Sequence, residues 1–409
     1  MIKYFVAFIF WFLLAKSSFS QEGKVHIKKA SIGFSLRVNS KDFFIVGMNW
    51  DYYPIGTNYK YSLWEQPTKT IKAALDYEMP LLKNMGVNTI RQYAVIPPKW
   101  IQYIYEHYGI YTVLNHTFGR YGVNINGKWE ANTDYSNPIV KETLLKEVDS
   151  MVIKYKNTPG LLMYLLGNEN NYGLFWQGAE TENIPLENRK TTIAATNLYQ
   201  LFNKVVISMK AIDNNFPIAI CNGDLMYLDI IAKECKDVDV FGVNIYRGLS
   251  FGDAFERIKT SYNKPVMLTE FGADAFNDIT KMEDQKDQAT CIVENWKEVY
   301  ANAAGGGKAQ NCIGGFTFQF SDGWWKSGQD INLEKHDSTA SWTNGGYYYD
   351  FKKGTNNMNE EWFGICAKGA TDKKGVYKLF PRAAYYALKK VNKKYRNSIL
   401  KQMPLKYAY

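Results

Sequence analysis

Two glutamates in this 409-residue sequence lie where carboxylate chemistry is expected. Glu169 ends the apolar run Leu161-Leu-Met-Tyr-Leu-Leu-Gly-Asn-Glu, and Glu270 ends the run Pro265-Val-Met-Leu-Thr-Glu. Runs of this kind are typical of parallel strands that are buried on both faces. A single glutamate at such an end is either solvated or part of a site, and two of them favour a site. Two facing carboxyls suit the cleavage of a glycosidic bond, for which one must be protonated and the other ionised.

Other polar residues at strand ends are expected to support these two carboxyls. Arg91 and Tyr246 are placed to stabilise an ionised Glu270, by charge and by a hydroxyl hydrogen bond. Asn168 either donates to the sugar hydroxyl next to the reacting carbon or is a turn residue. His116 either touches a sugar hydroxyl or is a satisfied histidine at the barrel mouth. The residues expected to bind substrate are Asn49, Arg91, Tyr93, His116, Asn168, Asn170, Asn222, Tyr246 and Trp324.

The elements that must position these residues alternate along the chain, with a short apolar strand followed by an amphipathic helix. Alternating units predict a parallel sheet, and eight units most simply close into a (β/α)8 TIM barrel. An open doubly wound sheet is the alternative, but no Gly-rich phosphate loop follows the first strand. The strands are predicted over residues 43–49, 88–93, 111–116, 160–167, 217–221, 238–245, 265–269 and 313–320. The helices are predicted over residues 71–85, 97–107, 140–155, 191–212, 226–234, 252–262 and 285–303, with a last one from Pro381.

Two segments fall outside this alternation. Residues 24–40 predict a short β-hairpin that covers the N-terminal end of the barrel. Residues 324–377 are rich in Gly, Asn, Asp and aromatic side chains and follow the eighth strand. They are expected to form a long loop on the face where barrels keep their active sites. A loop of this length is uncommon without a functional reason.

The two ends of the chain predict a processed, exported protein. Lys3 precedes an apolar run, and Ser18-Phe19-Ser20 supplies small residues at a cleavage site, so residues 1–20 are interpreted as a signal peptide. No cysteine follows it directly, which argues against a lipid anchor, while an uncleaved N-terminal anchor is the alternative. Residues 21–395 are expected to form one domain and residues 396–409 a basic tail. The predicted location is periplasmic or extracellular.

Composition limits the other functional classes. The formal net charge is +9, but the basic residues are concentrated after Glu361, which is not the uniform footprint of a nucleic-acid-binding protein. The five cysteines are widely spaced and include no Cys-x-x-Cys, and the four histidines are scattered, so neither a metal nor another cofactor is expected. One disulfide is possible in an oxidising compartment. The aromatic content of 16% fits either a large core or a carbohydrate-binding surface.

The motifs around both glutamates resemble those of the clan-A glycoside hydrolases. These barrels carry Asn-Glu after the fourth strand and a nucleophilic Glu after the seventh. Here the matching residues are Asn168-Glu169 and Glu270, the latter within Thr269-Glu-Phe-Gly272. The resemblance covers roughly residues 43–390. Within the clan, the sequence is similar to the family 2 barrel domain and to β-1,3-glucanosyltransferases, the latter through Gly86-Val-Asn-Thr-Ile-Arg91, Phe241-Gly-Val-Asn-Ile-Tyr246 and Gly314-Gly-Phe-Thr-Phe318.

The resemblance implies a retaining β-glycoside hydrolase with Glu169 as acid/base and Glu270 as nucleophile. Such enzymes form a covalent glycosyl-enzyme, with the two carboxyls about 5–5.5 Å apart. Aromatic residues near the mouth suggest several subsites and therefore a polysaccharide or oligosaccharide partner, and the transferase likeness favours β-1,3-glucan. Two alternatives stay open: a β-glucan transglycosylase, and a glycan-binding barrel without catalysis.

Overall fold

The computed structural model describes residues 24–30, 33–175 and 190–402. The interpreted signal peptide over residues 1–20 lies outside this part of the chain, as do residues 403–409 at the end of the expected basic tail. None of the helices in the described ranges is both long and apolar enough to cross a membrane.

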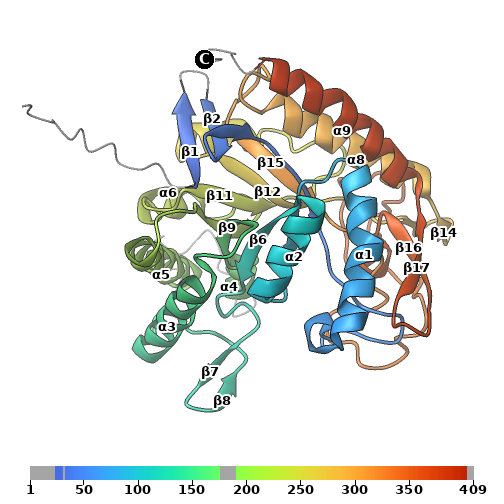
Figure 1. Ribbon diagram of the computed structural model, residues 1–409, viewed down its shortest axis with the longest axis horizontal. Helices are drawn as coiled ribbons and strands as arrows, with labels where there is room; N and C mark the ends of the chain where they lie inside the picture. Colours follow the sequence, from blue (N-terminus) through green and yellow to red (C-terminus); the bar gives the residue numbers. More distant parts are fainter. Residues whose placement is uncertain (1–23, 31–32, 176–189, 403–409) are drawn as a thin grey trace, which may run out of the picture.

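Eight parallel strands form a closed barrel (Figure 1). Each strand pairs with the next one of the barrel, and β15 pairs with β4 to complete the circle. This closure confirms the predicted TIM barrel and excludes an open doubly wound sheet. The barrel strands are β4 (Ile45–Asn49), β5 (Thr89–Gln92), β6 (Tyr111–His116), β9 (Leu161–Leu166), β10 (Ile218–Gly223), β11 (Val240–Asn244), β12 (Val266–Phe271) and β15 (Cys312–Thr317).

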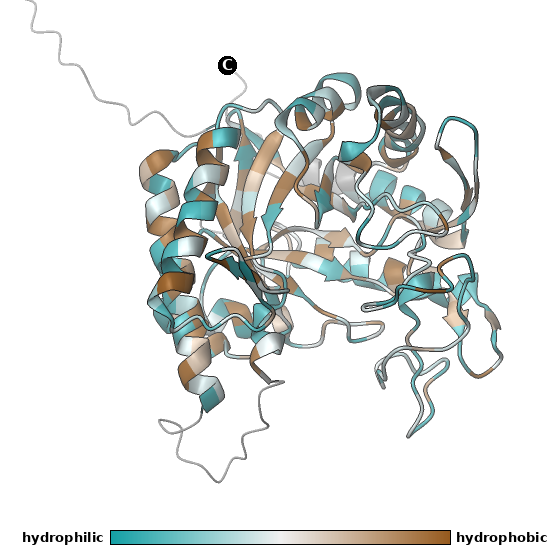
Figure 2. Ribbon diagram, turned by 90° about the horizontal axis from the view of Figure 1, so that it is seen from below, coloured by the Kyte–Doolittle hydropathy of each residue, from teal (hydrophilic) through white to brown (hydrophobic). Residues whose placement is uncertain are grey.

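Helices surround the barrel and explain why its strands are apolar on both faces. Figure 2 shows hydrophobic colour along the central strands, whereas the helices carry bands of both colours. A helix needs only one apolar stripe, because its other side faces water. The helices are α1 (Thr68–Asn84), α2 (Pro98–Tyr108), α3 (Pro138–Tyr155), α4 (Asn170–Phe175), α5 (Lys190–Ile212), α6 (Leu228–Glu234), α7 (Ala254–Ser261), α8 (Gln285–Ala301) and α9 (Ala383–Gln402), with 3-10 turns η1 (Leu63–Glu65) and η3 (Glu360–Trp362).

The N-terminal segment covers the end of the barrel at which the strands begin. The predicted hairpin is present as β1 (Val25–Ala30) and β2 (Gly33–Val38), and β3 (Lys41–Phe43) adds a third antiparallel strand. The backbone of this segment forms hydrogen bonds with residues that lie shortly before two barrel strands. Val25 N lies 3.0 Å from Asn215 O, and Phe34 N lies 3.2 Å from Gln310 O. These bonds fix the segment across the N-terminal ends of β10 and β15.

The stretch after β15 contains more regular structure than a loop. The expected loop over residues 324–377 gives way to a hairpin of β16 (Cys366–Thr371) and β17 (Tyr377–Pro381). The hairpin is tied to the barrel because Lys368 Nζ donates to Tyr53 O at 2.8 Å. Two shorter hairpins extend other loops on this face, β7 (Val123–Ile125) with β8 (Lys128–Glu130) and β13 (Phe276–Asn277) with β14 (Met282–Glu283).

In the C-terminal half, the structure moves one expected boundary and answers one question that the sequence left open. The boundary expected at residue 395 falls inside α9, which continues to Gln402, because its helical pattern does not end where the basic residues accumulate. The disulfide that the sequence left open is not formed. All five cysteines are buried and unpaired, namely Cys221, Cys235, Cys291, Cys312 and Cys366.

Candidate active site

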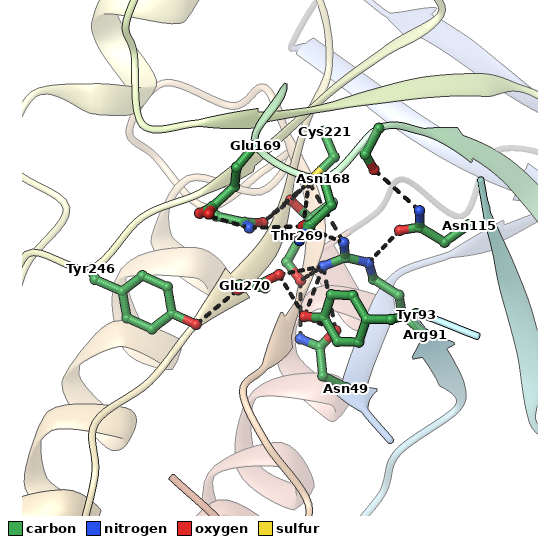
Figure 3. A network of polar contacts seen from close by, with 12 residues as sticks. Asn49, Arg91, Tyr93, Asn115, Asn168, Glu169, Cys221, Tyr246, Thr269 and Glu270 are labelled. Atoms are coloured by element: carbon green, nitrogen blue, oxygen red, sulfur yellow. Dashed lines mark hydrogen bonds and ion pairs between the residues drawn. The ribbon is translucent and has the colours of Figure 1, made fainter. Parts of the chain in front are cut away.

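The two glutamates meet at the C-terminal mouth of the barrel, on one network of hydrogen bonds (Figure 3). Successive side chains of a strand point to opposite faces, so every second residue points into the barrel. This alternation directs Arg91 on β5 inward, and Glu270 on β12 reaches its guanidinium. Glu169 approaches from the turn that follows β9.

Glu270 receives hydrogen bonds from three donors. Arg91 Nη1 lies 2.9 Å from Glu270 Oε1 in an ion pair. Tyr93 donates its hydroxyl to the same oxygen, and the Tyr246 hydroxyl donates to Oε2 at 3.0 Å. An adjacent cation and hydrogen bonds to the charged form both favour an ionised carboxyl. The three contacts engage both oxygens of Glu270 and fix its orientation.

Arg91 is the centre of this network and is fully buried. Its Nε donates to Asn115 Oδ1 at 2.9 Å, and its Nη2 donates to Asn168 Oδ1 at 2.8 Å. Its Nη1 also reaches Thr269 O at 3.1 Å and Asn49 Oδ1 at 3.4 Å. The rigid fork of the guanidinium matches several acceptors at once, which a lysine could not do. Asn49 is itself fully buried, so it orients Arg91 from below the open part of the mouth.

Glu169 has a different environment, with a single hydrogen-bond donor among the residues that the structure describes. Asn244 Nδ2 lies 3.0 Å from Glu169 Oε1. Burial among the surrounding loops raises the pKa of Glu169 to about 7, and the charge of Glu270 acts in the same direction. The Asn244 bond and the charges of Arg120 and Arg91 oppose that rise. A carboxyl with such a pKa carries a proton in a large fraction of molecules at neutral pH, as a general acid must.

The turn that presents Glu169 depends on local backbone conformation. Gly167 has φ +82°, and a Cβ built there would lie 2.5 Å from Asn170 Oδ1. That oxygen accepts the Asn168 backbone N–H at 2.8 Å and so holds the turn. Glu169 has φ +58°, a left-handed conformation that is unfavourable for a residue with a side chain and recurs at functional sites. The turn redirects the carboxyl of Glu169 from the strand towards the barrel axis.

A second set of residues joins the two glutamates beneath the mouth. Asn244 Nδ2 also lies 3.3 Å from Asn168 Oδ1, and Thr269 Oγ1 donates to Asn244 Oδ1 at 2.6 Å. Cys221 Sγ contacts Thr269 Oγ1 at 3.2 Å. Asn115, Cys221 and Thr269 were outside the predicted set, although their side chains point into the barrel and contact Arg91 or Asn244. These three residues limit the movement of the side chains that contact the two carboxyls.

His116 and Asn222 were expected in the site, but the structure places them on the outer face of their strands. The His116 ring accepts a backbone N–H through Nδ1, and its Nε2 lies 3.6 Å from Glu147 of α3. Burial lowers the pKa of His116 to about 4, so the ring is neutral. Asn222 Oδ1 accepts the Tyr199 hydroxyl from α5, and its Nδ2 donates to two backbone carbonyls. Each follows an inward residue by one position, so the alternation directs it to the helices.

Asn170 and Trp324 have partners in the loops around the mouth of the barrel. The amide of Asn170 is occupied within the loops, because Nδ2 donates to the Tyr135 hydroxyl at 2.7 Å and to Phe118 O at 2.9 Å. Trp324 stacks on His336 at 4.6 Å between ring centroids, and His336 stacks on Trp362 at 3.7 Å. Asn170 therefore joins two loops, and Trp324 joins a stack of rings in the segment after β15.

Comparison with solved structures shows the same fold. The chain is similar to a GH2 β-galacturonidase from Eisenbergiella tayi bound to galacturonate, with 16% identity and a TM-score of 0.54 over 91% of this chain and 54% of that one. A β-D-glucuronidase of Dictyoglomus thermophilum is 18% identical, with a TM-score of 0.52 over 90% of this chain and 54% of that one. Saccharomyces cerevisiae Gas2p in complex with laminaritetraose and laminaripentaose is 18% identical, with a TM-score of 0.53 over 92% of this chain and 69% of that one. The chain thus spans about half the length of the first two structures.

Sequence comparison identifies the family. No curated protein sequence matches this chain. The family model described as "Glycosyl hydrolases family 2, TIM barrel domain" matches residues 68–333, which is more than half of the chain. This range contains both glutamates, Arg91 and the Arg91 partners described above other than Asn49. The match agrees with the closed barrel and with the glycosidase folds named above, and it bears out the resemblance to clan-A glycosidases. The chain belongs to the glycosyl hydrolases of family 2, through their TIM barrel domain.

Proposed function

We propose that this protein is a retaining β-glycoside hydrolase that acts on a β-linked glucan. The observation that carries the proposal is the unequal environment of the two carboxyls. Glu270 is paired with buried Arg91 and two phenols, whereas burial raises the pKa of Glu169 to about 7. A pair of carboxyls with opposite protonation states is what double displacement requires.

The proposed reaction has two steps. In the first, the carboxylate of Glu270 attacks the sugar carbon and the bond to the leaving oxygen breaks, while Glu169 gives its proton to that oxygen. In the second, the Glu169 carboxylate takes a proton from water, and the water oxygen attacks the same carbon. The bond to Glu270 then breaks and its carboxylate is restored. Two inversions give net retention of configuration.

The substrate proposal rests on the rings at the mouth and on one of the structural relatives. Tyr53 and Tyr59 both lie against Trp325, at 5.5 and 5.8 Å between ring centroids. Tyr59 is half exposed, so this cluster offers ring surface to a chain of sugars. The Gas2p structure carries laminari-oligosaccharides, which favours a β-1,3-glucan for this chain among the possible β-glucans. An extracellular or periplasmic polysaccharide also fits the signal peptide that we propose for residues 1–20.

The roles of the two glutamates can be tested with an aryl β-glucoside. Glu270→Ala removes the nucleophile, and we expect turnover to vanish almost completely. Glu169→Gln should lower turnover by ~10²–10⁴-fold on a substrate with a poor leaving group. With a dinitrophenyl leaving group, azide should restore activity in Glu169→Ala and give a β-glucosyl azide, because the first step then needs no acid. Glu294→Gln, in an exposed pair with Lys297 on α8, is the matched control and should be unaffected.

Near-normal turnover in either glutamate variant would refute the assignment. If wild type binds β-glucans and cleaves none of them, the protein is the glycan-binding barrel of the alternative interpretation. Product sizes on laminari-oligosaccharides separate hydrolysis from transglycosylation, since only transfer gives products longer than the substrate. A panel of β-1,3-, β-1,4- and β-1,6-glucans, mannans and galactans identifies the sugar and the linkage.

A further inference from the structure

The loop over residues 117–122, between β6 and β7, forms a fixed wall beside the two glutamates. Thr133 donates its hydroxyl to Gly119 O, and the Tyr135 hydroxyl donates to Phe118 O at 2.9 Å. Asn170 Nδ2 donates to Thr117 O at 3.2 Å and to Phe118 O at 2.9 Å. Because Asn170 directly follows Glu169, the loop and the turn that carries the proposed acid are held together.

Tyr121 extends from this loop to the catalytic network. Its hydroxyl accepts a hydrogen bond from Asn168 Nδ2 at 2.9 Å, although the residue as a whole is 56% exposed. The hydroxyl end is surrounded by protein, and this burial is the main cause that raises the pKa of Tyr121. The charges of Glu270 and Glu169 act in the same direction, so the hydroxyl lies within electrostatic reach of both carboxyls. An exposed ring with its polar end in the site is placed to meet a ligand.

The amide of Asn168 is oriented so that one hydrogen stays available beside Tyr121. Asn168 Oδ1 accepts from Arg91 Nη2 at 2.8 Å and from Asn244 Nδ2 at 3.3 Å, which fixes the amide group. The NH₂ group has two hydrogens, and the Tyr121 hydroxyl takes one of them. The second hydrogen can then serve the sugar hydroxyl next to the reacting carbon. The Tyr121 hydroxyl still has its own hydrogen to donate while it accepts from Asn168.

We propose that Tyr121 is a substrate-contacting residue, which binds together with Asn168 the hydroxyl at C2 of the sugar that reacts with Glu270. This inference rests on the proposed function and specifies its substrate class, namely β-glycosides with a free 2-hydroxyl. A 2-deoxy sugar loses the partner of both donors. A 2-acetamido sugar places a bulky group against the wall formed by residues 117–122.

The test compares two substrates and two hydroxyl deletions. The substrates are an aryl β-glucoside and its 2-deoxy analogue, and the variants are Tyr121→Phe and the control Tyr135→Phe. Tyr135 anchors the same loop, but its hydroxyl bonds Phe118 O and Asn170 rather than Asn168. We expect Tyr121→Phe to lower kcat/KM about 10-fold on the 2-hydroxy substrate and less than about 3-fold on the 2-deoxy substrate. Tyr135→Phe should change both substrates by the same factor.

The ratio of the two kcat/KM values does not depend on the fraction of folded enzyme, so partial misfolding cannot imitate the expected result. An unchanged ratio in Tyr121→Phe would overturn the inference, because Tyr121 would then only position the loop. If wild type cleaves neither substrate nor any other glycoside of the panel, both the proposed function and this inference are refuted. Normal cleavage by wild type with an unchanged ratio refutes Tyr121 alone.

Discussion

The barrel mouth has two unlike sides, the end of β12 that carries Glu270 and the turn after β9 that carries Glu169. Glu270 lies within strand β12 and receives a buried cation and two phenol hydroxyls. Glu169 has a left-handed backbone and receives one amide hydrogen bond. The same side chain is therefore paired with a cation on one side, whereas burial raises its pKa to about 7 on the other.

This difference teaches that position on the fold selects the pair, whereas the neighbours assign the roles. Both glutamates follow apolar strands, and their own sequence contexts are alike. What separates them is the set of donors, which come from β5 and from the residues after β5 and β11 for Glu270. Two titratable groups whose environments push their pKa values apart are the usual sign of an acid and a base in one site.

Replacement of Arg91 should have the largest effect on the difference between the environments of Glu270 and Glu169. Arg91→Met takes away the only cation paired with Glu270 within the described chain and removes one donor each from Asn115 and Asn168. We expect at least a 10³-fold loss of kcat/KM, on the order of that for a lost oxyanion donor or more. Because the remaining carboxylate is buried, we also expect about 3–5 kcal/mol of lost stability in urea unfolding. The exposed Arg257→Met on α7 is the control, and similar behaviour of the two variants would contradict this account.

The pH dependence should sharpen the comparison on the Glu169 side. The acid must be protonated, and its pKa is about 7, so kcat/KM should fall about tenfold per unit as the pH rises above 7. Burial also raises the pKa of Asp51 to about 7, so the fall must be assigned by mutation. The Asn244 hydrogen bond lowers the pKa of Glu169, and Asn244→Ala should therefore move the fall to higher pH. A fall that stays in place or moves to lower pH would show that another group controls it.

The smallest expected effect concerns the turn itself. Gly167→Ala places a methyl group 2.5 Å from Asn170 Oδ1 at a residue with φ +82°. We expect a loss of about 1–3 kcal/mol in the free energy of unfolding, together with reduced turnover, because Glu169 shifts with the turn. Gly354 has φ +85° but nothing within 4 Å of the added carbon. Gly354→Ala thus measures the backbone cost alone, and an equal loss in both variants would mean that the contact with Asn170 is unimportant.

The barrel and its glutamate pair were predictable because both follow from burial. Strands that are covered on both faces must be apolar, as β9 shows with six buried residues in a row. The polar residue that ends such a run is then conspicuous. Arg91, Tyr93 and Tyr246 could be added, since a buried anion needs partners and these residues end neighbouring strands.

The errors arose where one residue of register decides the direction of a side chain. His116 and Asn222 end strands as Asn115 and Cys221 do, but they point to the helices. The residue types at a strand end do not show which side chain points into the barrel, whereas the contacts of the preceding residue do. Tyr121 lies in a loop whose path is set by tertiary hydrogen bonds to Thr133, Tyr135 and Asn170, so no local pattern indicates it. The β16–β17 hairpin was missed because its strands alternate buried and exposed residues within a Gly-rich stretch.

The five unpaired cysteines make the molecule a reporter of its own opening. Burial raises the pKa of the Cys221 thiol to about 11 and that of Cys312 to about 12, so neither is a reactive thiolate while the barrel is closed. The sulfurs are distributed around the fold, on β10, α8, β15 and β16 and directly after α6. A thiol reagent added to the native protein therefore records which part of the barrel separates first. The order of labelling along the chain is a map of local unfolding that requires no engineered probe.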